Sequence, residues 1–277
     1  MNHIEHISKY CNDAEVLDIL QKLGEYLYDL NEDKIRMESR RIITWKEAVC
    51  DEYLMEYKKL VRPGPPWHQG MHDLLLDLRT RNRHMKVVKL CADLGKRIGA
   101  RQQALSTIYP PGGYIGWHHN ADVPGRNLIF TWSKTGRGIF RYKRNIPGNT
   151  SLNYDIPDQV GWNVKSFDWF GHGEVERTGY SWHSAGTEGL RSTLAFVIQS
   201  NQMSNMLLEE DFNLHSWSDG CFISENDTQN KSEWWKENEE EITTMKLRSE
   251  IKKNIALGPT FAGRLFLAKQ LSKSLMH

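Results

Sequence analysis

The stretch from Gln103 to Ser200 constrains the fold most, because it is divided into short segments typical of β-strands. Each segment is rich in β-branched and aromatic residues, and Gly, Pro and Asn separate one segment from the next. The segments are ALSTIY, NLIFTWS, GIFRY, VGWNVKSFDWF and LRSTLAFVIQS. Several short strands at close spacing predict a mainly antiparallel sandwich or barrel.

Helical patterns flank this β-rich stretch on both sides. One helix is predicted within residues 14–30, a second over 45–60 and a third from about Met71 to Ile98, broken near TRNRH. Beyond residue 200 a polar stretch leads to two more helices, EWWKENEEEITTMKLRSEIKK and FAGRLFLAKQLSKSL. We therefore predict an α+β protein that forms one structural domain. Its parts are a helical N-terminal flank (1–102), a β-core (103–200) and a polar loop with C-terminal helices (201–277).

Composition narrows the class of protein. The 277 residues carry a net charge of +1, which gives no whole-protein argument for binding nucleic acid or membranes. The four cysteines stand alone in the sequence, so we expect reduced, buried thiols rather than disulfides or a thiolate zinc site. No apolar stretch resembles a signal peptide or a membrane span. We expect a cytoplasmic protein without membrane contact.

The sequence YIGWHHNADVPG contains the first candidate metal ligands. Its first five residues read as a strand that ends at His118. Side chains of like parity share a face of a strand, so His118 should lie with Tyr114 and Gly116. Ile115 and Trp117 should then pack against helices on the other face, with His119 beside them. This parity predicts that His118 points into the barrel interior.

A second histidine precedes a candidate anion site. His183 is followed by a predicted loop of small residues, and Arg191-Ser-Thr193 then opens a strand. Arg191 and Thr193 share a strand face, which places a cation and a hydroxyl in the same space. A buried, unpaired arginine is costly, so Arg191 needs an anion partner. A bound carboxylate held bidentately would meet that need.

This order of residues resembles the Fe(II)/2-oxoglutarate-dependent dioxygenases. A strand-end histidine with a nearby carboxylate, a second histidine some sixty positions later and an Arg-x-Thr eight residues beyond it carry the resemblance. Tyr109 and the glycines before the first histidine are similar to the prolyl-hydroxylase-like branch. GWHHNADVPGRNLIFTWS is similar to uncharacterised enzymes of this class encoded by bacteriophages. The resemblance covers roughly residues 103–200.

The resemblance implies a double-stranded β-helix (jelly-roll) core and an enzyme that uses Fe(II), 2-oxoglutarate and O₂. Such an enzyme hydroxylates, or oxidatively demethylates, a substrate and releases succinate and CO₂. Fe(II) is held by two histidines and one carboxylate, which leaves positions open for the co-substrate and O₂. The implied iron ligands are His118, Asp122 and His183. Arg191, Thr193 and Tyr109 would bind the distal carboxylate of 2-oxoglutarate.

The sequence departs from the family pattern at the third ligand. The usual motif is His-x-Asp or His-x-Glu, but Asn120 stands two positions after His118. Asp122 is four positions on, which is about 13 Å along a straight strand, so the chain must bend to bring it back. The alternatives are His119 with Asp122, Asn120 as a neutral ligand, or two histidines alone. Asp122 is preferred because a carboxylate balances the charge of Fe(II).

Two basic groups raise the question of a partner. Residues 79–101 hold eight Lys or Arg residues and one acid, Asp93, and residues 137–144 hold four more basic residues. They are either solvated surface or a surface that receives an anionic substrate, such as nucleic acid or an acidic protein segment. The rival to the enzyme hypothesis is a non-catalytic jelly-roll binding protein with a decayed metal site. Such a protein would use this basic surface for binding.

Overall fold

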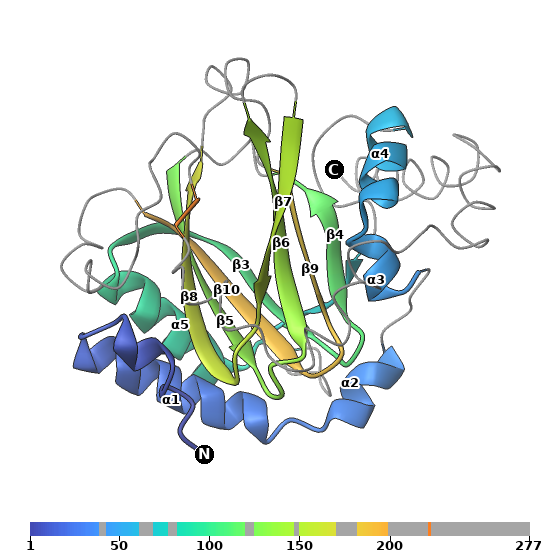
Figure 1. Cartoon of the computed structure of the whole chain (residues 1–277). Helices are drawn as coiled ribbons and strands as arrows, with labels where there is room; N and C mark the ends of the chain where they lie inside the picture. The colour runs from blue at the N-terminus through green and yellow to red at the C-terminus, as the bar shows by residue number, and fades with distance from the viewer. Residues whose placement is uncertain are drawn as a thin grey trace, which may run out of the picture.

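The chain folds as an α+β protein in which two antiparallel sheets face each other and helices lie outside them (Figure 1). The computed structural model describes residues 1–38, 43–60, 69–76, 82–119, 125–146, 150–169, 182–198 and 221–222. The predicted combination of helices with antiparallel strands is confirmed. The finer assignment to a double-stranded β-helix stays a prediction.

The strands form one larger and one smaller sheet. The six-stranded sheet has the order β11-β8-β5-β10-β3-β2, and the five-stranded sheet has the order β1-β4-β9-β6-β7. The strands of the larger sheet are β2 (His72–Asp73), β3 (Ala100–Tyr109), β5 (Gly125–Ser133), β8 (Gly161–Trp169), β10 (Arg191–Ile198) and β11 (Cys221–Phe222). Those of the smaller sheet are β1 (Gln69–Gly70), β4 (Tyr114–His118), β6 (Gly138–Ile146), β7 (Thr150–Pro157) and β9 (His183–Thr187).

The five segments predicted as strands correspond to β3, β5, β6, β8 and β10. Two other strands show where sequence patterns are weak. Strand β7 was not predicted, and the small residues after His183 form β9 rather than the expected loop. Small residues are depleted from strands in general, but β9 lies between β4 and β6, where its backbone is hydrogen-bonded on both sides.

Gly186 of β9 is required by the close approach of Trp45. A Cβ atom at position 186 would lie 2.4 Å from Cε3 of the Trp45 ring, which is itself buried. We expect Gly186→Ala to force the helix bearing Trp45 away from β9. Overpacking of this kind costs about 1–3 kcal/mol of the free energy of unfolding, which urea denaturation would measure. Unchanged stability would show that this contact is looser than the structure indicates.

The helices differ from prediction mainly in the second and third segments. Helix α1 (Ala14–Tyr28) is confirmed, while the second splits into α3 (Trp45–Ala48) and α4 (Asp51–Leu60). The predicted third helix is wrong in its first half, because His72 and Asp73 pair with β3 instead. Its second half is α5 (Met85–Arg97), which starts where a ring nitrogen of His84 accepts the Val87 N–H. The other helices in the described ranges are η1 (Ile7–Lys9) and α2 (Glu32–Glu38).

Three hydrophobic clusters define the layers. Helices α1 and α5 cover the outer face of the six-stranded sheet, where Leu20 and Leu94 pack with Phe196. Helices α3 and α4 cover the outer side of β4, where the Trp117 ring nitrogen donates to the Cys50 carbonyl at 2.9 Å. A third cluster, which includes Tyr109, Ile129 and Phe140, lies between the two sheets. The space between the sheets is therefore walled by strands on both sides.

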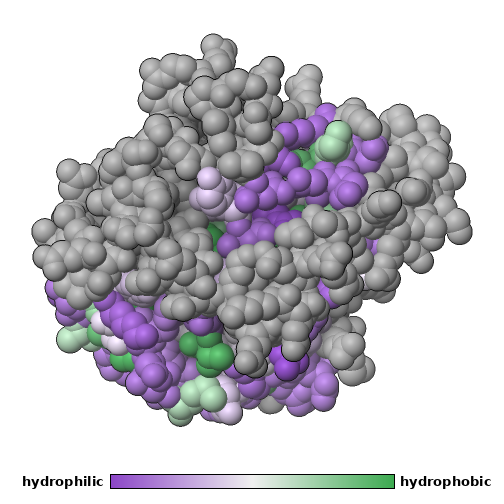
Figure 2. Space-filling model, in the orientation of Figure 1, coloured by the Kyte–Doolittle hydropathy of each residue, from purple (hydrophilic) through white to green (hydrophobic). Residues whose placement is uncertain are grey.

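One face of the molecule is largely polar among its described residues (Figure 2). On the face shown in Figure 2, hydrophilic side chains dominate the described residues and the hydrophobic ones form small separate groups. Within the described ranges, no helix is long and apolar enough to cross a membrane. The predicted C-terminal loop and helices (201–277) lie outside the described residues, apart from the short strand β11.

Candidate active site

A cavity of about 240 Å³ lies between the two sheets. Strands of both sheets line it, with His118 and His183 from the smaller sheet and Arg191, Thr193 and Asn127 from the larger. Its other walls are mostly apolar, so a few polar groups converge on an otherwise hydrophobic space. The volume is below the roughly 300–1,000 Å³ of pockets that hold drug-sized ligands. The cavity suits a small metabolite.

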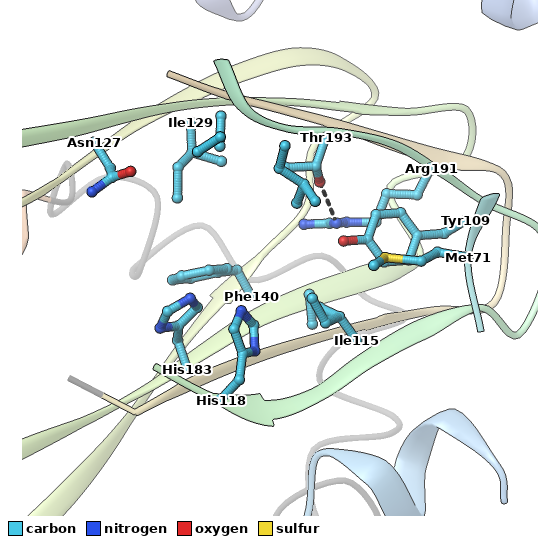
Figure 3. Close-up of a pocket in the computed structure, with 14 residues that line it drawn as sticks. Met71, Tyr109, Ile115, His118, Asn127, Ile129, Phe140, His183, Arg191 and Thr193 are labelled. Carbon is cyan, nitrogen blue, oxygen red and sulfur yellow. Dashed lines mark hydrogen bonds between the residues drawn. The ribbon is translucent and has the colours of Figure 1, made fainter. Parts of the chain in front are cut away.

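The two histidines predicted as metal ligands lie together on one wall (Figure 3). His118 of β4 is the direct cross-strand partner of His183 of β9, and their ring centroids are 4.1 Å apart. The Phe140 ring lies beside His183, at 5.7 Å between centroids. Residues separated by 65 positions in the sequence are thus brought together by one pair of antiparallel strands.

The surroundings of His118 favour a neutral ring with a defined tautomer. Its Nδ1 lies 2.9 Å from the Gly116 carbonyl oxygen, so an Nδ1–H would donate there and leave the Nε2 lone pair for a metal. Burial, and the adjacent His183, hold the pKa of the His118 imidazole well below its ordinary value. Neutral imidazole is the form that binds a metal ion. The histidine pair therefore fits a divalent metal.

Strand parity predicts the directions of His118 and Trp117 correctly but fails for Tyr114 and Ile115. Tyr114 packs outward with Trp117, whereas Ile115 lines the cavity with His118. The reason is a β-bulge: Ile115 pairs with Ala185 and His118 pairs with His183, so β4 uses one more residue than β9 over this interval. A bulge reverses the alternation beyond it. The prediction that Ile115 packs against helices is therefore wrong.

His119 lies on the opposite side of β4 from the cavity, as expected. Its ring makes an edge-to-face contact with Trp182, at 5.0 Å between centroids, and Trp182 belongs to the cluster under α3 and α4. His119 is buried, but it does not line the cavity. The pair of adjacent histidines is thus divided between two environments.

The predicted carboxylate-binding residues lie at the other end of the cavity (Figure 3). Arg191 and Thr193 occupy the same face of β10, and Nη1 of Arg191 donates to the Thr193 hydroxyl at 2.8 Å. The Arg191 guanidinium lies over the Tyr109 ring, 5.0 Å from its centroid. Tyr109 is the cross-strand partner of Arg191 on β3. The three residues predicted to bind a carboxylate are therefore adjacent.

The partner of Arg191 differs from the prediction. The guanidinium Nε donates to Oδ2 of Asp158 at 2.8 Å, and both side chains are almost completely buried. The idea that Arg191 needs a bound anion as its only counter-charge is therefore wrong. Among the described residues, however, Nη2 of Arg191 has no hydrogen-bond partner. The end of the guanidinium can still bind a ligand carboxylate.

Two functional candidates were missed by sequence analysis. Asn127 of β5 is buried and points into the cavity near His183 (Figure 3). Its signal is present in NLIFTWS, because Asn127 alternates with Ile129 and Thr131 on one strand face. Asp158 lies between β7 and β8 in a segment without a recognisable motif. Only the tertiary structure brings it to Arg191.

The predicted third metal ligand lies in a part of the chain that the structure does not describe. Asp122 and the alternative Asn120 lie outside the described residues. Within the described part, no group of three or more His, Cys, Asp or Glu residues could hold a metal ion. The His118–His183 pair is thus two thirds of the predicted ligand set, and Asp122 stays a prediction.

The described parts of the two basic groups lie beside different sheets. Helix α5 covers the outer face of the larger sheet, and Lys89 and Arg97 on it form ion pairs with acids. Strand β6 belongs to the smaller sheet, where Arg141 is completely buried against Asp155. Arg141 therefore contributes no charge to the surface. The existence of an anionic partner stays a prediction.

Comparisons with known proteins add little to this geometry. No protein-family model and no curated protein matches the sequence. Among solved structures, a prolyl-4-hydroxylase from Pseudomonas putida is similar over 61% of this chain and 89% of its own, with 13% identity and a TM-score of 0.26. A carbohydrate-binding module of Cellvibrio mixtus lichenase 5A, in complex with cellotriose, is similar over 37% and 93%, with 16% identity and a TM-score of 0.18. With TM-scores this low, neither similarity supports a conclusion about function.

Proposed function

We propose that this protein is an Fe(II)- and 2-oxoglutarate-dependent dioxygenase. One observation carries the proposal: one small cavity has two buried histidines on one wall and a buried arginine with a threonine hydroxyl at its other end. A five-carbon keto-dicarboxylic acid has two ends that match these two groups. The proposal takes the facing sheets as the two halves of a double-stranded β-helix, within one structural domain.

His118 and His183 would hold the metal, with Asp122 as the third ligand. The hydrogen bond from His118 to the Gly116 carbonyl would fix the ring so that Nε2 faces the metal. When bound, Fe(II) with O₂ and 2-oxoglutarate supplies the oxidising power that inserts one oxygen atom into a substrate C–H bond, with release of succinate and CO₂. The protein's own residues position these reactants and exclude water.

Arg191 would bind the distal carboxylate of 2-oxoglutarate. The N–H groups that Asp158 and Thr193 leave free would give a charge-assisted contact, and the Tyr109 ring would support the guanidinium through a cation–π contact. The apolar walls, including Ile115 and Ile129, would exclude water from the carbon chain of the co-substrate. Such a site selects a ligand by the distance between its two ends.

Turnover of 2-oxoglutarate tests this proposal. The purified full chain, loaded with Fe(II) under anaerobic conditions and then exposed to O₂, should convert 2-oxoglutarate to succinate slowly even without a substrate. Succinate and CO₂ should form in equal amounts and require both metal and O₂. A protein that binds Fe(II) and 2-oxoglutarate but forms no succinate would contradict the catalytic proposal. A protein that binds neither would favour the non-catalytic alternative.

A further inference from the structure

The Arg191–Asp158 ion pair is buried and incomplete. Its side chains are 1% and 0% exposed, so water screens neither charge. Asp158 uses only Oδ2 to accept from Arg191, and its Oδ1 has no hydrogen-bond partner among the described residues. Arg191 lines the cavity, whereas Asp158 does not. The carboxylate therefore lies on the side of the guanidinium that a ligand does not reach.

A second buried pair in the same protein shows what a closed ion pair looks like. Arg141 donates from Nε and Nη2 to both oxygens of Asp155, and its Nη1 donates to the Val49 carbonyl at 3.0 Å. That pair lies against the segment between α3 and α4, away from the cavity. In contrast, Arg191 gives Asp158 a single hydrogen bond and keeps its end toward the cavity. The three nitrogens of the Arg141 guanidinium all donate to protein oxygens, whereas Arg191 keeps its Nη2 for a ligand.

The position of the Asp158 carboxylate is fixed by β6. Its backbone N–H donates to the Gly138 carbonyl at 2.9 Å. A Cβ atom at position 138 would lie 2.4 Å from Oδ2 of Asp158, so only glycine leaves room for the carboxylate there. The backbone of Asp158 is thus anchored to β6, and its carboxylate fills the space beside Gly138. A ligand carboxylate would have to share the guanidinium with it.

We propose that Asp158 is a positioning residue that acts as the resident counter-ion of Arg191 and lowers the affinity of the cavity for a carboxylate ligand. In the ligand-free protein it compensates a buried cation, which would otherwise be strongly destabilising. In the bound protein, two carboxylates share one guanidinium and repel each other. Asp158 therefore stabilises the ligand-free protein more than the bound one. The identity of the ligand as 2-oxoglutarate rests on the proposed function, but the role of Asp158 does not.

Asp158→Asn separates this role from a merely structural one. The amide keeps an oxygen acceptor for Nε but removes the charge. Without ligand, the unfolding temperature should fall. With the protein loaded with Mn(II), calorimetric titration should give a dissociation constant for 2-oxoglutarate about tenfold lower than that of the wild type, because the ligand becomes the only counter-ion. A purely structural residue would lower stability without raising affinity.

Asp155→Asn is the matched control, because it removes the same charge from the closed pair. It should lower the unfolding temperature and leave the affinity for 2-oxoglutarate unchanged. A folded Asp158→Asn protein that binds 2-oxoglutarate with unchanged or lower affinity overturns the inference. If Asp158→Asn does not fold, Asp158→Ser provides the same test with a smaller oxygen acceptor.

A second probe keeps the inference distinct from the proposed function. If wild type and variants all fail to bind 2-oxoglutarate, the proposed function is wrong, and acetate then tests Asp158 alone. Acetate should raise the unfolding temperature of the metal-free Asp158→Asn or Asp158→Ser protein more than that of the wild type or Asp155→Asn. Equal shifts in all the proteins would overturn the role assigned to Asp158.

Discussion

Arg191→Ala should abolish measurable 2-oxoglutarate binding while metal binding persists. The substitution removes the charged N–H groups at one end of the cavity and leaves the histidine pair, at the other end, untouched. Truncating one partner of a buried, charged hydrogen bond costs roughly 2–5 kcal/mol, so the dissociation constant should rise by about a hundredfold or more. Calorimetric titration with Mn(II), followed by titration with 2-oxoglutarate, measures the affinity for each in the same sample.

The same substitution leaves Asp158 buried without its cation, which lowers stability. The double variant Arg191→Ala/Asp158→Asn removes that stranded charge and is the control for unfolding. It should be more stable than Arg191→Ala and still fail to bind 2-oxoglutarate. If either variant, folded and metal-loaded, binds 2-oxoglutarate as the wild type does, then Arg191 is not the carboxylate anchor.

His183→Ala and His118→Ala should each weaken binding of Fe(II) or Mn(II) by about a hundredfold or more. Loss of even an outer partner of a metal ligand costs about 10–100-fold in affinity, and loss of a ligand should cost at least as much. Both variants should also lose succinate formation. Metal affinity is best measured by competition with a coloured chelator under anaerobic conditions, which separates binding from turnover.

His119→Ala is the matched control for the histidine pair. His119 is adjacent in sequence and equally buried, but its ring contacts Trp182 rather than the cavity. The variant should lose some stability, because the edge-to-face contact is removed, and should keep its affinity for the metal. Loss of metal binding in His119→Ala, with retention in His118→Ala, would favour the alternative pairing of His119 with Asp122.

The sequence predicts the ends of the candidate site better than its middle. Each end of the cavity can be predicted from a short sequence pattern. One pattern is a histidine at the end of a strand, and the other is Arg-x-Thr on one strand face. Their grouping in a single cavity follows from strand pairing, since His118 faces His183 and Arg191 faces Tyr109. A resemblance to a known family supplied the expectation that they belong together.

Features that depend on tertiary contacts could not be predicted. The β-bulge before His118 changes which neighbours line the cavity, and no residue in YIGWH marks it. The Arg191–Asp158 pair joins residues from different elements, and a lone Asp in a turn gives no sign of such a role. The sequence predicts a loop in place of strand β9 because Ser184, Ala185 and Gly186 are poor strand formers, although Trp45 requires a small residue at position 186.

A crystal structure of the protein soaked anaerobically with Mn(II) and 2-oxoglutarate tests the central claim most directly. We predict one metal ion bound to Nε2 of His118 and to the His183 ring, with Asp122 as the third protein ligand. The keto-acid end of 2-oxoglutarate should lie on the metal and its distal carboxylate on Arg191, with Asp158 still paired to Nε. A metal ion bound away from the histidine pair, or 2-oxoglutarate bound outside the cavity, would contradict the assignment.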